Sequence, residues 1–208
     1  MQIIEKYFTR LSPAQQQALS QLFPLYQEWN AKINLISRKD IDNLYEHHIL
    51  HSLAIAQYIN FAPQARVLDL GTGGGFPGIP LAILFPNTQF TLIDGTLKKI
   101  KVVKAVAEAL GLSNVTAIQI RAEEVKDRFD FVVSRAVASM EKLIPWSFRL
   151  LSKTHQHALP NGLIALKGGN VKAEFDALPN RHYYEVTPIN DFFQEPYFEE
   201  KFLVYVQG

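Results

Sequence analysis

A glycine-rich segment carries the strongest chemical signal in the sequence. It reads Asp69-Leu-Gly71-Thr-Gly73-Gly-Gly75. Glycine adopts positive φ without steric cost and leaves the backbone bare, so a loop of this composition lets a ligand approach main-chain atoms. The segment joins an apolar strand pattern to a helix pattern, which is where nucleotide-binding loops occur. We therefore predict a site for a nucleotide-containing ligand at residues 69–78.

Two cofactor classes compete for this loop. Residues 73–78 satisfy the dinucleotide pattern G-x-G-x-x-G, and Tyr197 with Lys201 matches the Y-x-x-x-K spacing of one dehydrogenase group. However, Tyr197 and Lys201 precede the last predicted strand instead of lying on a long helix. An acidic residue two positions before the first glycine, here Asp69, is typical of S-adenosylmethionine sites. The pattern therefore favours S-adenosylmethionine over a nicotinamide dinucleotide.

The loop residues are expected to have separate roles in such a site. Gly71, Gly73 and Gly75 would let the chain pass beneath the methionine part of the cofactor. The carboxylate of Asp69 would either orient the loop or meet the ammonium group of the cofactor. The sequence leaves both roles of Asp69 open.

Two further strand ends complete the predicted cofactor site. Asp94, at the end of the second predicted strand, would accept hydrogen bonds from both ribose hydroxyls, and it is also placed to cap the helix that begins at Leu97. Ala122 and Glu123 follow the third predicted strand and would border the adenine. For Glu123 alone, a solvated acid at a helix start is an equally good interpretation.

The elements that must position these residues are strands that alternate with helices. Alternation of this kind predicts a mostly parallel sheet with helices on both faces, whose ligands bind at the carboxyl ends of the strands. The predicted strands are 66–70, 90–94, 115–120, 129–134 and 163–167, with a closing pair at 183–186 and 202–206. The predicted helices between them are 79–84, 97–110 and 140–151.

The first 60 residues have helical patterns instead. Ser12 with Gln15 forms a capping-box pattern that predicts a helix start, and a second helix is predicted from after Asp40 to Ala56. We therefore predict an N-terminal helical extension over residues 1–60 and a cofactor domain over residues 61–208. The predicted fold class is α/β, with the Rossmann-like sheet of class I S-adenosylmethionine-dependent methyltransferases.

Composition excludes several function classes. The 208 residues include no cysteine, which rules out disulfides, thiolate metal sites and a cysteine nucleophile. No apolar run approaches the length of a membrane span, and the first residues make a poor secretory signal, so we expect a soluble, cytoplasmic protein. We also expect a monomer with no bound metal. The formal net charge is only +1, so any contact with nucleic acid must come from a local basic patch.

Beyond the glycine loop, the sequence resembles the ribosomal RNA small-subunit methyltransferase G family (RsmG or GidB) over nearly the whole chain. The extension of the loop through Phe76-Pro-Gly-Ile-Pro80 is far more specific than the bare glycine pattern. The matching stretches are Trp29-Asn30, Asn34-Leu35, His48-Ile-Leu50, Ser52-Leu53, Asp69 to Pro80, Arg121-Ala-Glu123, Phe129-Asp130, Ser134-Arg-Ala136 and Leu166-Lys-Gly168.

The resemblance implies an activity, a partner and a set of contacts. Members of the family transfer a methyl group from S-adenosylmethionine to N7 of one guanine near the decoding region of 16S rRNA. The implied partner is therefore 16S rRNA, in the small ribosomal subunit or in its assembly intermediate. By position, the implied cofactor contacts are Gly71, Phe76, Asp94, Gly95, Thr96, Ala122, Glu123 and Arg135.

The chain departs from the family pattern at a few positions. His51 replaces a usual aspartate and Gly95 a usual serine, while Lys99 and Lys201 occupy positions that often hold arginine. These departures concern RNA or ribose contacts and not the class of reaction. His48 lies on an apolar helical stripe, which favours a buried structural histidine over an RNA contact.

The predicted reaction needs no catalytic residue. Guanine N7 has a lone pair and no proton, so its attack on an activated methyl group requires only positioning. Methylation of pyrimidine carbon 5 generally uses a cysteine, which is absent. Methylation of exocyclic adenine amines usually shows an N/D-P-P-Y motif, where this chain has Ser134-Arg-Ala-Val137. Ribose 2′-hydroxyl methylation stays open because Lys167 lies near the right strand end.

We expect a local basic rim to hold the RNA. Its main members are Arg121, Lys167 and Lys201, whereas Lys98 and Lys101 fit a solvated helix face equally well. Two rival classes remain, a small-molecule methyltransferase with the helical extension as a lid and a non-catalytic module that binds S-adenosylmethionine.

Overall fold

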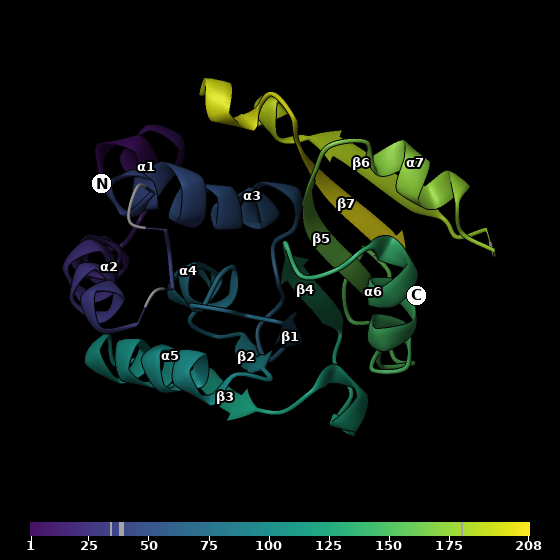
Figure 1. The fold of residues 1–208 in the computed structure, drawn as a ribbon, viewed down its shortest axis with the longest axis horizontal. Coiled ribbons are helices and arrows are strands. Elements are labelled where there is room, and N and C mark those ends of the chain that lie inside the picture. The colour runs from purple at the N-terminus through teal and green to yellow at the C-terminus, as the bar shows by residue number, and fades with distance from the viewer. Residues whose placement is uncertain (34, 38–39, 180) are drawn as a thin grey trace.

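A computed structural model describes residues 1–33, 35–37, 40–179 and 181–208, and its centre is a seven-stranded sheet (Figure 1). The strand order is β3-β2-β1-β4-β5-β7-β6. The strands are β1 (Arg66–Leu70), β2 (Gln89–Asp94), β3 (Val115–Gln119), β4 (Phe131–Arg135), β5 (Gly162–Gly168), β6 (Tyr184–Pro188) and β7 (Lys201–Gln207).

The direction of the strands changes once across the sheet. Strands β1 to β5 pair in parallel, whereas β7 runs antiparallel to β5 and β6 antiparallel to β7. The chain reverses at β1, from which β2 and β3 extend to one side and β4 and β5 to the other. In parallel sheets, ligands bind at this switch point, beyond the carboxyl ends of the strands. The predicted α/β sheet is confirmed.

Helices cover both faces of the sheet. Figure 1 shows α2 to α5 on one side, and α6 with α7 on the other. The helices are α1 (Gln2–Tyr7), α2 (Pro13–Lys32), α3 (His51–Tyr58), α4 (Gly78–Leu84), α5 (Leu97–Ala109), α6 (Met140–Phe148) and α7 (Val171–Asp176). Shorter segments are η1 (Ile41–Asn43), the π-helix η2 (Leu44–Leu50), η3 (Ala122–Glu124), η4 (Ile189–Asp191) and η5 (Pro196–Phe198).

Alternating side chains of the strands divide the core between the two faces. In β4, Phe131 and Val133 join the cluster under α2 to α5, whereas Val132 joins the cluster under α6 and α7. The first cluster also holds Leu22 and Tyr26 from α2. The helical extension is therefore packed on the sheet through a shared core, and the division into residues 1–60 and 61–208 stays a prediction.

Two predicted helices differ from the structure. The helix expected from after Asp40 to Ala56 consists of η1, the π-helix η2 and then α3. The helix expected over 140–151 ends at Phe148, because the carbonyl of Leu150 accepts a hydrogen bond from the backbone of Phe129 and Leu151 bridges to the same residue. The capping box of Ser12 and Gln15 is confirmed at the start of α2. Asn34 lies outside the described residues.

Within the described ranges, no helix is both long and apolar enough to cross a membrane.

Candidate functional site

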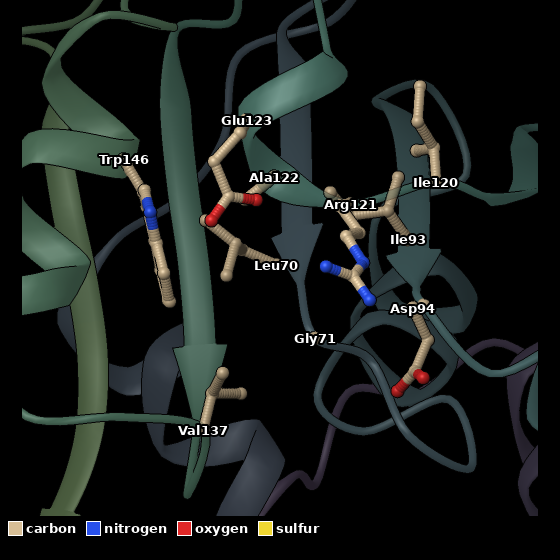
Figure 2. A pocket seen from close by; sticks show the side chains of 11 residues that line it. Leu70, Gly71, Ile93, Asp94, Ile120, Arg121, Ala122, Glu123, Val137 and Trp146 are labelled. Atoms are coloured by element: carbon tan, nitrogen blue, oxygen red, sulfur yellow. The ribbon is translucent and has the colours of Figure 1, made fainter.

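A pocket of about 290 Å³ opens at the carboxyl ends of β1, β2 and β4, and we call it the strand-end pocket. Figure 2 shows Trp146 on one side of it and Asp94 on the other, with Glu123 and Arg121 between them. Its lining residues are Leu70, Gly71, Ile93, Asp94, Gly95, Ile120, Arg121, Ala122, Glu123, Val137 and Trp146.

The buried side chain of Asp69 holds the glycine loop from inside the protein. Its side chain is fully buried, and Oδ2 accepts hydrogen bonds from the Thr72 hydroxyl at 2.6 Å and from the Gly78 backbone N–H at 2.8 Å. Gly78 begins α4, so this carboxyl joins the end of β1 to the start of the helix. Burial raises the pKa of Asp69 to about 7, although both hydrogen bonds oppose the rise. Of the two predicted roles, the contacts support the orientation of the loop.

Glycine is required by space at two loop positions. A Cβ on Gly71, whose φ is +74°, would lie 2.5 Å from Val137, and one on Gly75, whose φ is +103°, would lie 2.7 Å from Ile79. The hydroxyl of Tyr26, on α2, donates to the carbonyl of Gly74 at 2.7 Å. The helical extension therefore holds the loop directly.

Asp94 binds the loop from the second strand. One carboxylate oxygen accepts from the backbone N–H of Gly73 at 3.1 Å and the other from that of Thr96 at 2.8 Å, and Lys99 lies 3.5 Å away. Thr96, and not Asp94, is the N-cap residue of α5. The carboxylate is 9% exposed, and it lines the strand-end pocket. It is therefore an acceptor oriented by backbone donors at the pocket wall.

The end of β4 separates the strand-end pocket from a second cavity. Ala136 has a φ of +54°, a conformation that a residue with a Cβ rarely adopts. Val137 lines the strand-end pocket, while Arg135 lines the second cavity together with Ala136. Consecutive residues at the end of β4 therefore line two different pockets.

We call the second cavity, of about 340 Å³, the basic pocket. It lies between η2 and α3 on one side and the ends of β4, β5 and β7 on the other. Its lining residues are His48, His51, Arg135, Ala136, Leu166, Lys167, Gly168, Tyr197 and Lys201.

A chain of side-chain contacts holds Arg135 in place. Its guanidinium donates to the carbonyl of His47 and to Nδ1 of His48, both at 3.0 Å, and lies over the ring of Phe76. Because Nδ1 accepts, Nε2 of His48 carries the proton that it donates to Asp40 at 2.7 Å. Burial and the Arg135 charge lower the pKa of His48 to about 4, against the pull of Asp40. A neutral His48 therefore orients Arg135.

Lys167 is held by the protein itself. Its ammonium donates to the carbonyl of Ala138 at 3.0 Å and forms an ion pair with Glu174 at 2.9 Å. Only 12% of the side chain is exposed. Both contacts occupy the ammonium group with partners inside the protein.

The predicted site residues divide among the two pockets and the protein interior. The strand-end pocket brings together Gly71, Asp94, Gly95, Arg121, Ala122 and Glu123. The basic pocket brings together Arg135, Lys167 and Lys201. Neither pocket is lined by Asp69, Gly73, Gly75, Phe76 or Thr96. Among these, Phe76 is 4% exposed and packs against Tyr26. In the described part of the chain, no three His, Asp or Glu side chains are grouped to hold a metal ion.

Sequence reasoning missed several lining residues. Val137 and Trp146 border the strand-end pocket, and His51 borders the basic pocket, where Tyr197 had been weighed only as part of a dehydrogenase pattern. Val137 follows a predicted strand end, which was a usable signal. Trp146 lies within α6 and carries no local sign of its position.

Comparisons with known proteins agree along the length of the chain. The family model described as rRNA small subunit methyltransferase G matches residues 15–190. A Ribosomal RNA small subunit methyltransferase G from Bacteroides thetaiotaomicron is 54% identical over 207 residues, which cover 100% of both chains. One with the same name from Flavobacterium psychrophilum is 55% identical over 206 residues, covering 99% of this chain and 97% of that protein.

Solved structures with the same fold are more distant in sequence. A precorrin-6y C5,15-methyltransferase from Geobacter metallireducens has a TM-score of 0.56 at 12% identity, over 85% of this chain and 92% of that one. A SAM dependent methyltransferase from Aquifex aeolicus has a TM-score of 0.55 at 16% identity, over 82% and 98%. At such identities the likeness concerns the fold alone.

Proposed function

The chain belongs to the rRNA small subunit methyltransferase G family, and we propose that it transfers a methyl group from S-adenosylmethionine to N7 of a guanine in 16S rRNA. The observation that carries this proposal is the match at 54% identity over the full length of a relative with that name. The paired pockets support it, because a transferase needs a cofactor site and a substrate site that meet.

The strand-end pocket fits S-adenosylmethionine chemically. Asp94 offers carboxylate oxygens for ribose hydroxyls, and Ala122 with Trp146 offers an apolar wall for adenine. A Cβ on Gly73 would have nothing closer than 4.0 Å, so this part of the loop is open to a ligand. The cofactor would supply an activated methyl group. The proposed contacts are Asp69, Gly71, Gly73, Gly75, Phe76, Asp94, Gly95, Thr96, Ala122, Glu123 and Arg135.

The protein is expected to contribute positioning and no proton transfer. The polar side chains that line the basic pocket are mostly hydrogen-bond donors, and the ammonium of Lys167 forms an ion pair with Glu174. Guanine N7 has no proton to lose, so attack by its lone pair requires none of these side chains to act as a base. The residues at the end of β4 would hold the guanine edge against the strand-end pocket and exclude water.

This mechanism predicts a flat pH profile. The single-turnover rate with saturating cofactor and ribosomal substrate should change less than about twofold between about pH 7.5 and about pH 9, whereas a required base would raise it about tenfold per pH unit below its pKa. Rapid-quench kinetics would measure the rate, and digestion of labelled RNA would identify 7-methylguanine. Lys167→Met should keep the flat profile.

Other results would favour the rival functions. A steep pH limb that Lys167→Met removes, with the label on ribose, would indicate 2′-hydroxyl methylation. Turnover with a small acceptor but not with RNA would indicate a small-molecule methyltransferase. Cofactor binding without any turnover would indicate a binding module. Mass spectrometry of 16S rRNA from cells with and without the protein tests the proposal as a whole.

We further propose that Arg121, Lys167 and Lys201 contact the RNA. Arg121 is exposed at the strand-end pocket, and no carboxylate in the described part of the chain forms an ion pair with its guanidinium. Lys201 opens on the basic pocket. The partner would be 16S rRNA in the small subunit or its assembly intermediate, met by a monomer in the cytoplasm.

Removal of the Arg121 charge should weaken RNA capture. Arg121→Ala is expected to lower the slope of log K against log salt by roughly one unit, because one phosphate contact is lost. Lys153→Ala removes an exposed charge beyond β4, near its amino end, and should leave the slope unchanged. Salt titrations of RNA binding measure both. Equal slopes for wild type and Arg121→Ala would place the RNA elsewhere.

A further inference from the structure

The basic pocket contains cations whose charge the protein does not neutralise. Lys201 forms no ion pair with any carboxylate in the described ranges, and its ammonium lies 5.0 Å from the centre of the Tyr197 ring. Arg135 donates only to neutral groups, the carbonyl of His47 and the ring of His48. Of the three cationic side chains in the lining, only Lys167 has a carboxylate partner. The lining of the basic pocket therefore holds two cations without a carboxylate partner.

His51 adds an unsatisfied polar group to the same wall. The side chain is 5% exposed, and neither Nδ1 nor Nε2 has a hydrogen-bond partner. Burial, followed by the charges of Arg135 and Lys201, lowers the pKa of His51 well below its usual range, which the carbonyl of His47 only weakly opposes. Burial of a neutral imidazole without a hydrogen-bond partner carries a desolvation cost. A ligand that supplies an acceptor oxygen to this ring would remove that cost.

The charge of the pocket selects the class of ligand. Inside a cavity, two uncompensated cations attract an anion far more strongly than a neutral group. Phosphate oxygens accept from guanidinium, ammonium and imidazole donors together, and such charge-assisted bonds are the strong ones. A neutral nucleobase would leave both charges uncompensated. Moreover, methylation at N7 places a positive charge on the guanine, which a nearby phosphate would offset.

We propose that the basic pocket binds a backbone phosphate of the RNA beside the guanine to be methylated, with Lys201 and Arg135 supplying charge and His51 a hydrogen bond. This inference rests on the proposed function. Arg135 and Ala136 line the basic pocket, and the next residue, Val137, lines the strand-end pocket, so the proposed phosphate site is adjacent along β4 to the proposed cofactor site. His51 is thereby assigned a role in substrate binding.

Binding of guanine nucleotides to the protein saturated with S-adenosylhomocysteine tests the proposal. The saturating ligand would fill the strand-end pocket and so prevent GMP from binding there. We expect 5′-GMP or 3′-GMP to bind at least about tenfold more tightly than guanosine, because each charge-assisted bond contributes that much or more. Inorganic phosphate should compete with GMP. Calorimetry measures the affinities.

Substitutions at Lys201 and His51 locate the phosphate. Lys201→Gln should lower the affinity for GMP by about tenfold and leave that for guanosine unchanged. Lys153→Gln, which changes an exposed lysine near the amino end of β4, should leave both affinities unchanged. His51→Leu should weaken GMP binding several-fold, and His51→Gln, which restores a donor, should recover part of the loss. Unchanged S-adenosylhomocysteine affinity shows that each variant is folded.

Equal affinities for GMP and guanosine would overturn the proposal, as would a phosphate preference that is undiminished in Lys201→Gln. Methylation of 16S rRNA is measured separately. If GMP and guanosine bind equally well but 16S rRNA is methylated, only the proposed phosphate site is contradicted. If 16S rRNA is not methylated, the proposed function is contradicted.

Discussion

Gly73→Asp is expected to reduce S-adenosylmethionine affinity by about 100-fold or more, which corresponds to about 2.7 kcal/mol. Gly73 has a φ of +57°, and its backbone N–H donates to Asp94. An added side chain would project into the open side of the loop, where the cofactor would lie. Its carboxylate would also repel Asp94 and disturb the acceptor proposed for the ribose.

Gly111→Asp is the matched control for this substitution. Gly111 has a φ of +63°, open space around its Cβ position, and a place after the end of α5. Aspartate at this position introduces the same backbone strain and the same negative charge as Gly73→Asp, but away from the strand-end pocket. Calorimetry should show normal cofactor affinity for Gly111→Asp only. Equal affinities for both variants, or tight binding of NAD by the wild type, would refute the cofactor assignment.

Asp69→Asn is expected to change how stability depends on pH. Burial raises the pKa of Asp69 to about 7, so the native state holds the proton more tightly than the unfolded chain. The stability that Asp69 contributes is therefore fully present below about pH 4 and is lost as the pH rises through about 7. Asparagine keeps an acceptor for Thr72 and Gly78 and does not titrate.

The variant should therefore gain stability relative to wild type as the pH rises. The gain between about pH 4 and about pH 8 is roughly 4 kcal/mol, from about three pH units at about 1.4 kcal/mol each. Urea unfolding of both proteins across this range measures it. A difference in unfolding free energy that stays constant with pH would show that the carboxyl titrates normally.

The central strands were predictable because strands buried on both faces consist of nearly continuous apolar residues. β1, β4 and β5 are apolar runs covered on both faces, and their predicted bounds hold to within two residues. Helices α1 and α7 have six residues each, too few to show a helical period, and depend on tertiary contacts. The π-helix η2 was not predicted, because no sequence pattern indicates hydrogen bonds to the carbonyl five residues back.

The candidate site was predictable as a set of strand ends but not as two pockets. Asp94 and Ala122 follow parallel strands, so the topology alone brings them to one edge of the sheet. Arg121, expected on an RNA rim, lies in the strand-end pocket beside Asp94, because η3 turns directly after β3. His51 reaches the basic pocket because α3 packs against β5 and its ring contacts Tyr197 and Phe198 of η5, which only the tertiary structure reveals.

The register of η2 amounts to one residue inserted into an α-helix. The backbone N–H of His51 bonds to the carbonyl of Glu46, five residues back, and not to that of His47. The carbonyl of His47 is thereby left to accept from Arg135 and from the hydroxyl of Tyr197. Such turns are rare and often lie at functional sites. Deletion of one residue between 44 and 50 is expected to restore the ordinary α-helical register. The carbonyl of His47 would then accept from within the helix, and Arg135 would lose an acceptor that holds its guanidinium at the basic pocket.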